Sequence, residues 1–366
     1  MIVGTRPEAI KLAPLAHALA AIGIAPRLLL TGQHPNLRPE DHGLGGLPCD
    51  QLGCAGIADP IAHAALVAAA IEPILDRDLP DLVIVQGDTS SALGGARAAA
   101  KLDFALAHVE AGLRSFDQAM PWPEEGNRIA IDALADLLFA PTEGAAANLR
   151  SEEVTGEILV TGNTGIDALL AVLGTLAPLK PQARRLDDPL DILVTCHRRE
   201  NWGGGIEAVA AALIELASER TARVEVIIHP NPQVADAMRM LFAREPGITL
   251  SPPTGHRGMI ERMRRAELIL SDSGGVQEEA PTLGVPLLVL RERTERPEAL
   301  AAGNAMLVGT STEQILADVR RLHRDRAALA AMARPSQPFG DGHAAPRIAG
   351  HIRRWLLHRD QRSSAA

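Results

Sequence analysis

The stretch LVIVQGDTSSALGGARAAAKLDFALAHVE, residues 82–110, decides the fold class. Two short apolar runs, Leu82–Val85 and Ala105–Val109, have the length of buried parallel strands, and an alanine-rich helical pattern lies between them. A strand, a helix and a second strand in this order form a βαβ unit, whose strands run parallel. The stretch therefore predicts an α/β fold with a doubly wound parallel sheet.

The same alternation continues along the chain and predicts two Rossmann-like domains. Further strands are predicted at residues 28–30, 137–140, 192–195, 224–228, 268–270 and 286–290, with helices at residues 206–218 and 312–323. The proline-interrupted segment Leu173–Pro189 is the predicted linker. We expect one domain over residues 1–172 and another over residues 185–342, with the ligand in a central cleft between them. A basic helix at residues 343–360 is expected to pack back onto the first domain.

Composition disfavours several classes of function. Only 2% of the 366 residues are aromatic and none is tyrosine, which disfavours modules that stack ligands on aromatic rings. The net charge of −9 disfavours a nucleic-acid or membrane-surface role. The three cysteines form neither a CxxC pair nor an even disulfide set, and no apolar run is long enough to span a bilayer. We therefore expect a cytoplasmic protein with no membrane or nucleic-acid partner.

The motif GTRPEAIK, residues 4–11, follows a short apolar run and opens a helix. Thr5 and Glu8 have the spacing of a capping box at the start of that helix. A helix N-terminus attracts anions, and Arg6 and Lys11 would reinforce that attraction. A well-capped surface helix with no ligand explains the motif equally well.

Three further motifs carry carboxylates: VQGDTSS (residues 85–91), HVEAGLRS (108–115) and WPEEGNR (122–128). Asp88, Glu110 and Glu124 are candidate acid/base residues, because moving a proton between the two faces of a carbon needs carboxyls in different protonation states. In the last motif, one of the two adjacent glutamates is expected to pair with Arg128. The simpler alternatives for the three motifs are helix capping, an ion pair with Arg114 and the acidic bias of a first helical turn, respectively.

The second predicted domain supplies positive charge and glycine. Its motifs are TCHRREN (residues 195–201), SDSGGVQEE (271–279) and RERTERPE (291–298). His197, next to two arginines at a strand end, is a candidate phosphate ligand, although a lone histidine is usually structural. Gly274 and Gly275 would let a phosphate approach backbone N–H groups at a helix N-terminus. The arginines of the last motif would add charge to this site, although alternating charge usually marks a solvated ion-pair run.

Taken in order, these motifs resemble those of the non-hydrolysing UDP-N-acetylglucosamine 2-epimerases over nearly the whole chain. The resemblance implies a GT-B fold, a UDP-sugar substrate, a homodimer and a mechanism without metal or redox cofactor. It also implies reversible epimerisation at C2 of UDP-N-acetylglucosamine, for the synthesis of cell-surface polysaccharide precursors. Anti elimination of UDP would give 2-acetamidoglucal, and re-addition would give UDP-N-acetylmannosamine.

The resemblance also assigns roles to individual residues. It implies that Asp88, Glu110 and Glu124 are the acid/base carboxylates and that His197 lies near the diphosphate. For the UDP moiety it implies phosphate contacts from Arg6 and Lys11, a phosphate-binding turn at Ser273, Gly274 and Gly275, ribose binding by Glu279, and Arg296 as the arginine of the nucleotide site.

Three other functions stay open on the residues. A hydrolysing relative would release free N-acetylmannosamine and UDP, and the sequence does not discriminate against it. A GT-B glycosyltransferase would have no obvious use for three carboxylates. A non-catalytic sensor of UDP-sugars would not need them intact.

The chain also departs from the family at several positions. The glycine- and proline-containing segment Pro35–Gly56 replaces a region that in bacterial members helps form an allosteric substrate site, so activation by substrate is left open. Cys196, Arg293 and Ala133 differ from the residues usual in the family. These differences leave every candidate catalytic residue in place but could alter sugar selectivity.

Overall fold

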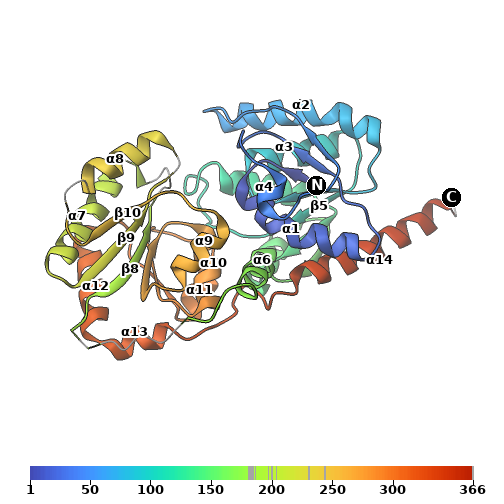
Figure 1. The fold of residues 1–366 in the computed structure, drawn as a ribbon. Coiled ribbons are helices and arrows are strands. Elements are labelled where there is room, and N and C mark those ends of the chain that lie inside the picture. The colour runs from blue at the N-terminus through green and yellow to red at the C-terminus, as the bar shows by residue number, and fades with distance from the viewer. Residues whose placement is uncertain are drawn as a thin grey trace. The chain divides into compact units, whose positions relative to one another are not determined.

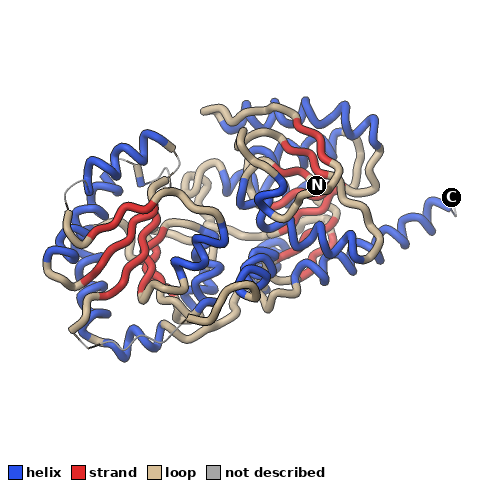
Figure 2. The backbone as a smooth tube through the Cα atoms, in the orientation of Figure 1, coloured by secondary structure: helices blue, strands red, loops and turns tan. Residues whose placement is uncertain are grey.

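The computed structural model describes residues 1–179, 185, 187–196, 198, 201–202, 204–229, 231–242 and 245–364. The chain divides into two compact units: unit 1 is Met1–Leu170 with Phe339–Ala366, and unit 2 is Ala171–Pro338. In each unit, helices cover the faces of parallel sheets (Figure 1, Figure 2). The predicted α/β class with two Rossmann-like domains is therefore confirmed.

The strands of unit 1 are short, parallel and mostly buried. They are β1 (Ile2–Val3), β2 (Leu28–Leu30), β3 (Cys49–Gln51), β4 (Val83–Gln86), β5 (Leu106–Val109), β6 (Leu137–Ala140) and β7 (Glu157–Val160). Hydrogen-bonded neighbours run in the orders β1-β2-β3 and β4-β5-β6-β7. Strand β1 also contacts β4. The strands β2 and β3 therefore lie on one side of the β1–β4 pair and β5, β6 and β7 on the other, so the strand order reverses between β1 and β4. Doubly wound folds bind ligands at the carboxyl ends of strands at such a switch point.

Helices cover both faces of the unit 1 strands. They are α1 (Arg6–Ala21), the 3-10 helix η1 (Pro39–His42), α2 (Pro60–Asp78), α3 (Ser90–Lys101), α4 (Glu124–Leu134), α5 (Glu143–Ser151), α6 (Thr164–Leu173) and α14 (Ala344–Ser364). Alternate strand residues point to opposite faces, so Val83 and Val85 pack in the cluster with α2 and α3, whereas Ile84 packs in the cluster with α1 and α14. Helix α14 lies beside α1 and buries Ile348 and Ile352 there (Figure 1).

Unit 2 holds a six-stranded parallel sheet in the part of the chain that is described. Its strands are β8 (Leu190–Thr195), β9 (Ala222–Ile227), β10 (Ile248–Ser251), β11 (Leu268–Ser271), β12 (Leu287–Val289) and β13 (Ala305–Leu307). The order β10-β9-β8-β11-β12-β13 reverses between β8 and β11, which is the second switch point. The helices are α7 (Gly204–Ser218), α8 (Pro232–Phe242), α9 (His256–Met263), α10 (Gly274–Leu283), α11 (Pro297–Ala301), α12 (Thr312–Arg324) and α13 (Arg326–Met332).

The segment Pro35–Gly56, which departs from the family pattern, forms η1 and the edge strand β3. Leu44 is buried in the core cluster that contains α1, and β3 pairs in parallel with β2. The segment is therefore an ordered part of unit 1.

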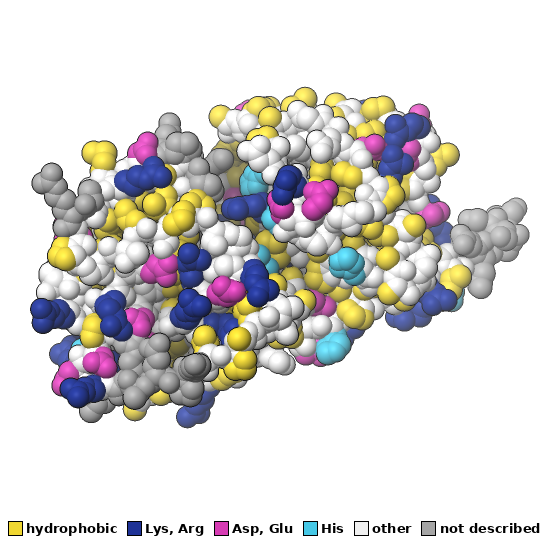
Figure 3. All heavy atoms as spheres, in the orientation of Figure 1, with side chains coloured by type: hydrophobic (Ala, Val, Ile, Leu, Met, Phe, Trp, Pro, Cys, Tyr) yellow, Lys and Arg dark blue, Asp and Glu magenta, His cyan; other side chains and the backbone are white. Residues whose placement is uncertain are grey.

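The surface carries charges of both signs. On the face shown in Figure 3, Lys and Arg side chains lie in small groups with Asp and Glu side chains. Arg320 also forms ion pairs with Glu215 and Glu219, with an Arg320–Glu219 distance of 2.6 Å. In the described chain, no helix combines the length and the apolar character needed to cross a membrane.

Candidate active site

Glu8 joins two turns at the carboxyl ends of β1 and β4. Its Oε2 atom accepts from the backbone nitrogens of Gly4 at 2.7 Å and Thr5 at 2.6 Å, as expected of a capping pair. Its Oε1 atom accepts from the hydroxyl of Thr89, the N-cap of α3, at 2.5 Å. Burial raises the pKa of Glu8 to about 7, although these hydrogen bonds oppose the shift. Glu8 therefore caps α1, as predicted, and also links the start of α1 to the start of α3 through Thr89.

Glu110 follows β5 directly and is held by a cation. Its backbone is in the left-handed region, with φ 71°. The Nζ atom of Lys11 lies 2.8 and 2.7 Å from its two carboxylate oxygens, and the amide of Gln86 also donates to it. The side chains of Lys11 and Glu110 are only 11% and 6% exposed. A lysine expected to contact phosphate thus lies against a carboxylate expected to transfer protons.

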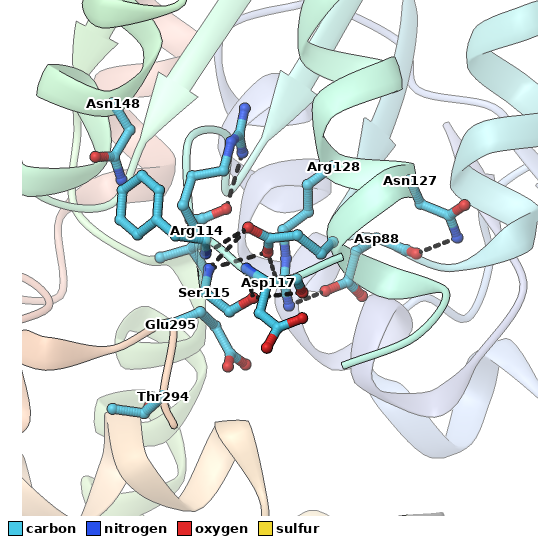
Figure 4. A network of polar contacts seen from close by, with 12 residues as sticks. Asp88, Arg114, Ser115, Asp117, Asn127, Arg128, Asn148, Thr294 and Glu295 are labelled. Atoms are coloured by element: carbon cyan, nitrogen blue, oxygen red, sulfur yellow. Dashed lines mark hydrogen bonds and ion pairs between the residues drawn. The ribbon is translucent and has the colours of Figure 1, made fainter. Parts of the chain in front are cut away.

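Asp88 follows β4 and is paired with Arg128 of α4 (Figure 4). The other guanidinium nitrogen of Arg128 lies 3.0 Å from Glu125 Oε2, and both glutamate oxygens accept from the backbone nitrogen of Ser115, at 2.9 and 3.0 Å. Glu125 therefore pairs with Arg128, which confirms the prediction that one of the two adjacent glutamates does so. Glu124, at the first position of α4, is half-buried.

A fully buried histidine, His108, connects the turns that carry Asp88 and Glu110. Its Nδ1 atom lies 2.6 Å from Asp132 Oδ1, and its Nε2 atom lies 2.8 Å from the carbonyl oxygen of Gly87. The second oxygen of Asp132 accepts from the backbone nitrogen of Gly112 at 3.1 Å and from Arg114 at 2.7 Å. Burial alone would raise the pKa of Asp132, but His108 and Arg114 hold it below its ordinary value.

Arg6 lies exposed at the first position of α1, where its backbone nitrogen donates to His34 Nδ1 at 3.3 Å. Burial and the charge of Arg6 lower the pKa of His34. Arg6 comes after β1, Asp88 after β4 and Glu110 after β5, and these strands are neighbours in unit 1. Four candidate residues therefore gather at the carboxyl ends of these strands: Arg6, Lys11, Asp88 and Glu110.

The predicted phosphate-binding turn opens α10 in unit 2. Ser273 is the N-cap of α10, and Gly274 is its first residue. A Cβ atom on Gly274 would lie 2.8 Å from the guanidinium of Arg296, so a larger residue here would require Arg296 or the turn to shift. Arg296 donates to Glu278 at 2.7 Å and also contacts Glu295. A guanidinium held against the N-terminus of a helix is an arrangement suited to binding an anion.

Asp272 contacts Arg198 and Asn201, two described residues that come after β8. This fully buried carboxylate accepts from the backbone nitrogen of Arg198 at 2.8 Å and from the amide of Asn201 at 3.0 Å. The predicted phosphate ligand His197 lies outside the described residues.

Glu279, the predicted ribose ligand, already has a partner that the sequence did not indicate. Its Oε1 atom lies 2.7 Å from Nε2 of His256, at the start of α9, and both side chains are largely buried. His256 is 23 positions away and belongs to no motif, so only the tertiary structure identifies it. Among the described residues, no cluster of His, Cys, Asp and Glu is arranged to hold a metal ion.

Comparison with known proteins assigns the chain to a family. The family model described as UDP-N-acetylglucosamine 2-epimerase matches residues 18–353. The chain belongs to this family. The UDP-N-acetylglucosamine 2-epimerase of Yersinia pestis is 40% identical over 361 residues, which cover 95% of this chain and 96% of that protein.

Solved structures of the family agree over nearly the full length. The Neisseria meningitidis UDP-GlcNAc 2-epimerase bound to UDP-GlcNAc has a TM-score of 0.88 at 34% identity, covering 96% of this chain and 98% of the other. The S. aureus MnaA–UDP co-structure has a TM-score of 0.87 at 34% identity, covering 97% and 96%. The predicted GT-B fold and the assignment as an epimerase, an isomerase, are therefore confirmed.

Proposed function

We propose that this chain interconverts UDP-N-acetylglucosamine and UDP-N-acetylmannosamine by elimination and re-addition of UDP. The observation that carries the proposal is the gathering of Arg6, Lys11, Asp88 and Glu110 at the carboxyl ends of neighbouring strands of unit 1. Relatives at about 40% identity bear the epimerase name, and the related structures contain UDP-GlcNAc or UDP.

The carboxylates of unit 1 supply the proton transfers in this scheme. One carboxylate takes the C2 proton, the C–H electron pair forms the C1=C2 double bond, and the C1–O bond breaks with its electrons passing to the β-phosphate of UDP. In the return step, the phosphate oxygen attacks C1 and a second carboxyl group protonates C2 on the opposite face. Asp88, Glu110 and Glu124 are the proposed acid/base groups. Arg128 holds Asp88 and Lys11 holds Glu110.

Unit 2 supplies the anion binding that the departing UDP requires. Ser273, Gly274 and Gly275 form the N-terminus of α10, where backbone N–H groups are available to an anion. Arg296 lies against this turn. Fixed positive charge stabilises the leaving diphosphate without reorganisation during the reaction. Glu279 is the proposed ligand of the ribose hydroxyls, and His197 the proposed ligand near the diphosphate.

One experiment tests the proposal and separates it from its rivals. UDP-N-acetylglucosamine is incubated with the protein in heavy water, and the products are followed by NMR. We expect deuterium at C2 together with a mixture of the two UDP-sugars. Release of free N-acetylmannosamine would assign the hydrolysing reaction instead, and a substrate recovered without deuterium would favour a non-catalytic UDP-sugar sensor.

We propose that the chain works as a homodimer, as its family resemblance implies. The face of α2 and the loop before it expose apolar side chains: Ile57 is 47% exposed, Ile61 63% and Leu66 46%. Clustered exposed apolar residues are typical of interaction surfaces. Light scattering after gel filtration should give the mass of two chains, and the I61E/L66E variant should give one. A wild-type mass of 38.7 kDa would refute the dimer.

We also propose a cytoplasmic location. Cys49, Cys54 and Cys196 are all free thiols, which suits a reducing compartment. Fractionation of cells that express the chain tests this, and recovery outside the cytoplasm would overturn it.

A further inference from the structure

His108 faces a hydrogen-bond acceptor on each side of its ring. Asp132 Oδ1 lies 2.6 Å from Nδ1, and the carbonyl oxygen of Gly87 lies 2.8 Å from Nε2. A carbonyl oxygen accepts only, so Nε2 must carry a hydrogen. A neutral imidazole has only one N–H group, whereas the imidazolium has two. If Asp132 is ionised, both bonds form only when His108 is protonated on both nitrogens.

The surroundings of Asp132 favour its ionised form. Its second oxygen accepts from Gly112 at 3.1 Å and from the guanidinium of Arg114 at 2.7 Å, and both of these groups only donate. Arg114 in turn lies 2.6 Å from Glu152, at the end of α5. The charged groups gathered around the ring are thus Asp132 from α4, Arg114 after β5 and Glu152. With an imidazolium, the buried His108 and Arg114 carry two positive charges, which meet the negative charges of the buried Asp132 and of Glu152, whose side chain is 31% exposed.

This network spans the two turns that carry proposed catalytic carboxylates. Gly87, whose carbonyl accepts from His108, directly precedes Asp88. Gly112, whose nitrogen donates to Asp132, comes two residues after Glu110. The backbone at Gly112 has φ +83°, and a Cβ atom there would lie 2.3 Å from the carbonyl oxygen of Ala145, so the second turn has little freedom to adjust.

We propose that His108 is a positioning residue that is held as an imidazolium and ties the Asp88 turn to the Glu110 turn through Asp132. It does not itself transfer the C2 proton. Loss of either hydrogen bond would allow one turn to move relative to the other. Small displacements of a reacting group lower the rate of the chemical step more than they weaken substrate binding.

Two variants separate the two hydrogen bonds of the ring. In H108N, the side-chain amide can replace Nδ1 opposite Asp132 but cannot reach Gly87. In H108Q, the longer amide can replace Nε2 opposite Gly87 but loses Asp132. For each variant we expect kcat of epimerisation to fall about 10- to 100-fold with KM changed less than about threefold. The affinity for UDP, measured by calorimetry, should stay at the wild-type value.

A matched control is H63N. His63, on α2, is also buried, and its Nε2 atom lies 3.1 Å from the carbonyl oxygen of Cys54. This variant should lose stability without losing kcat. Equal losses of kcat in H63N and H108N at temperatures where both are folded would show that His108 acts only through stability, which overturns the proposal.

The protonation state gives a readout that does not depend on activity. In protein labelled with ¹⁵N-histidine, the signal that disappears in H108N should show hydrogens on both ring nitrogens at neutral pH. A signal of a neutral tautomer would overturn the inference even if the wild type is active. The inference rests on the proposed function only for its kinetic part: a wild type that puts no deuterium at C2 would refute that function and leave the spectroscopic test valid.

Discussion

The ammonium nitrogen of Lys11 lies 2.8 Å from one carboxylate oxygen of Glu110 and 2.7 Å from the other. The two residues are 99 positions apart, and both side chains are nearly buried. Such a pair fixes the position of the carboxylate and its charge at the same time. It also makes the carboxylate dependent on the lysine, because a buried charge that loses its partner is costly.

The first prediction concerns this pair. K11M should lower the free energy of unfolding by about 3 kcal/mol, because Glu110 would keep its charge in a buried site without its cation. The double variant K11M/E110Q should recover much of that loss, since the neutral amide needs no counterion. Urea unfolding of the wild type, K11M, E110Q and K11M/E110Q measures the coupling energy between Lys11 and Glu110. A K11M variant within about 0.5 kcal/mol of the wild type would mean that the pair is weak, as most exposed pairs are.

A second prediction follows from the raised pKa of Glu8, about 7 against an ordinary value of 4.5. The folded state binds this proton more tightly than the unfolded state, so the protonated carboxyl stabilises the fold. That contribution is complete below about pH 4.5 and is lost as the pH rises to about 7. The loss amounts to about 3 kcal/mol, since a tenfold change in proton affinity is worth about 1.4 kcal/mol.

E8Q isolates this contribution, because the amide keeps the size of the side chain but does not titrate. Denaturation between pH 4.5 and 7 should show a shallower loss of stability with pH in E8Q than in the wild type. E143Q is the matched control, because the side chain of Glu143 is 78% exposed. If the stability of E8Q depends on pH in the same way as that of E143Q and the wild type, the carboxyl of Glu8 has an ordinary pKa and the prediction is wrong.

Much of the fold was predictable because its strands are short apolar runs with helices between them. The predicted strands at residues 28–30 and 137–140 match β2 and β6 residue for residue, and others differ at their ends by one or two residues. The edge strand β3, Cys49–Gln51, gave no apolar signal because its side chains are mostly exposed. Its pairing with β2 depends on the rest of unit 1, which periodicity does not report.

The site was predictable in its residues but not in its connections. Local spacing identified the cap at Glu8 and predicted that one of the two adjacent glutamates pairs with Arg128, but it did not say which one. Nothing in the spacing indicated that Lys11 would lie against Glu110, or that Asp132 would join His108 to Arg114. Such contacts link residues far apart in the chain, and only the packing of strands and helices brings them together.

A third prediction tests Glu279 as the ribose ligand. The wild type should bind UDP about tenfold more tightly than 2′-deoxy-UDP, since a hydrogen bond to a charged group is worth about 1.5 kcal/mol or more. E279A should bind the two ligands with affinities within about twofold of each other. H256F, which removes the 2.7 Å contact that orients Glu279, should reduce the discrimination partly. Calorimetry measures all six affinities, and undiminished discrimination in E279A would remove Glu279 from the ribose site.

The last prediction concerns the turn at the N-terminus of α10. In G274A the added Cβ atom would meet the guanidinium of Arg296 at 2.8 Å, so Arg296 or the turn must shift. Because Arg296 is buried against Glu278, it has little room to move, and the backbone N–H groups should lose their approach to the diphosphate. We expect the Kd for UDP to rise about 10- to 100-fold, in keeping with the loss of one or two hydrogen bonds to a charged ligand. The control is G204A at the start of α7, where an added Cβ atom would meet no other atom within 4 Å and the affinity should be unchanged. A G274A variant that binds UDP as tightly as G204A does would place the diphosphate elsewhere in unit 2.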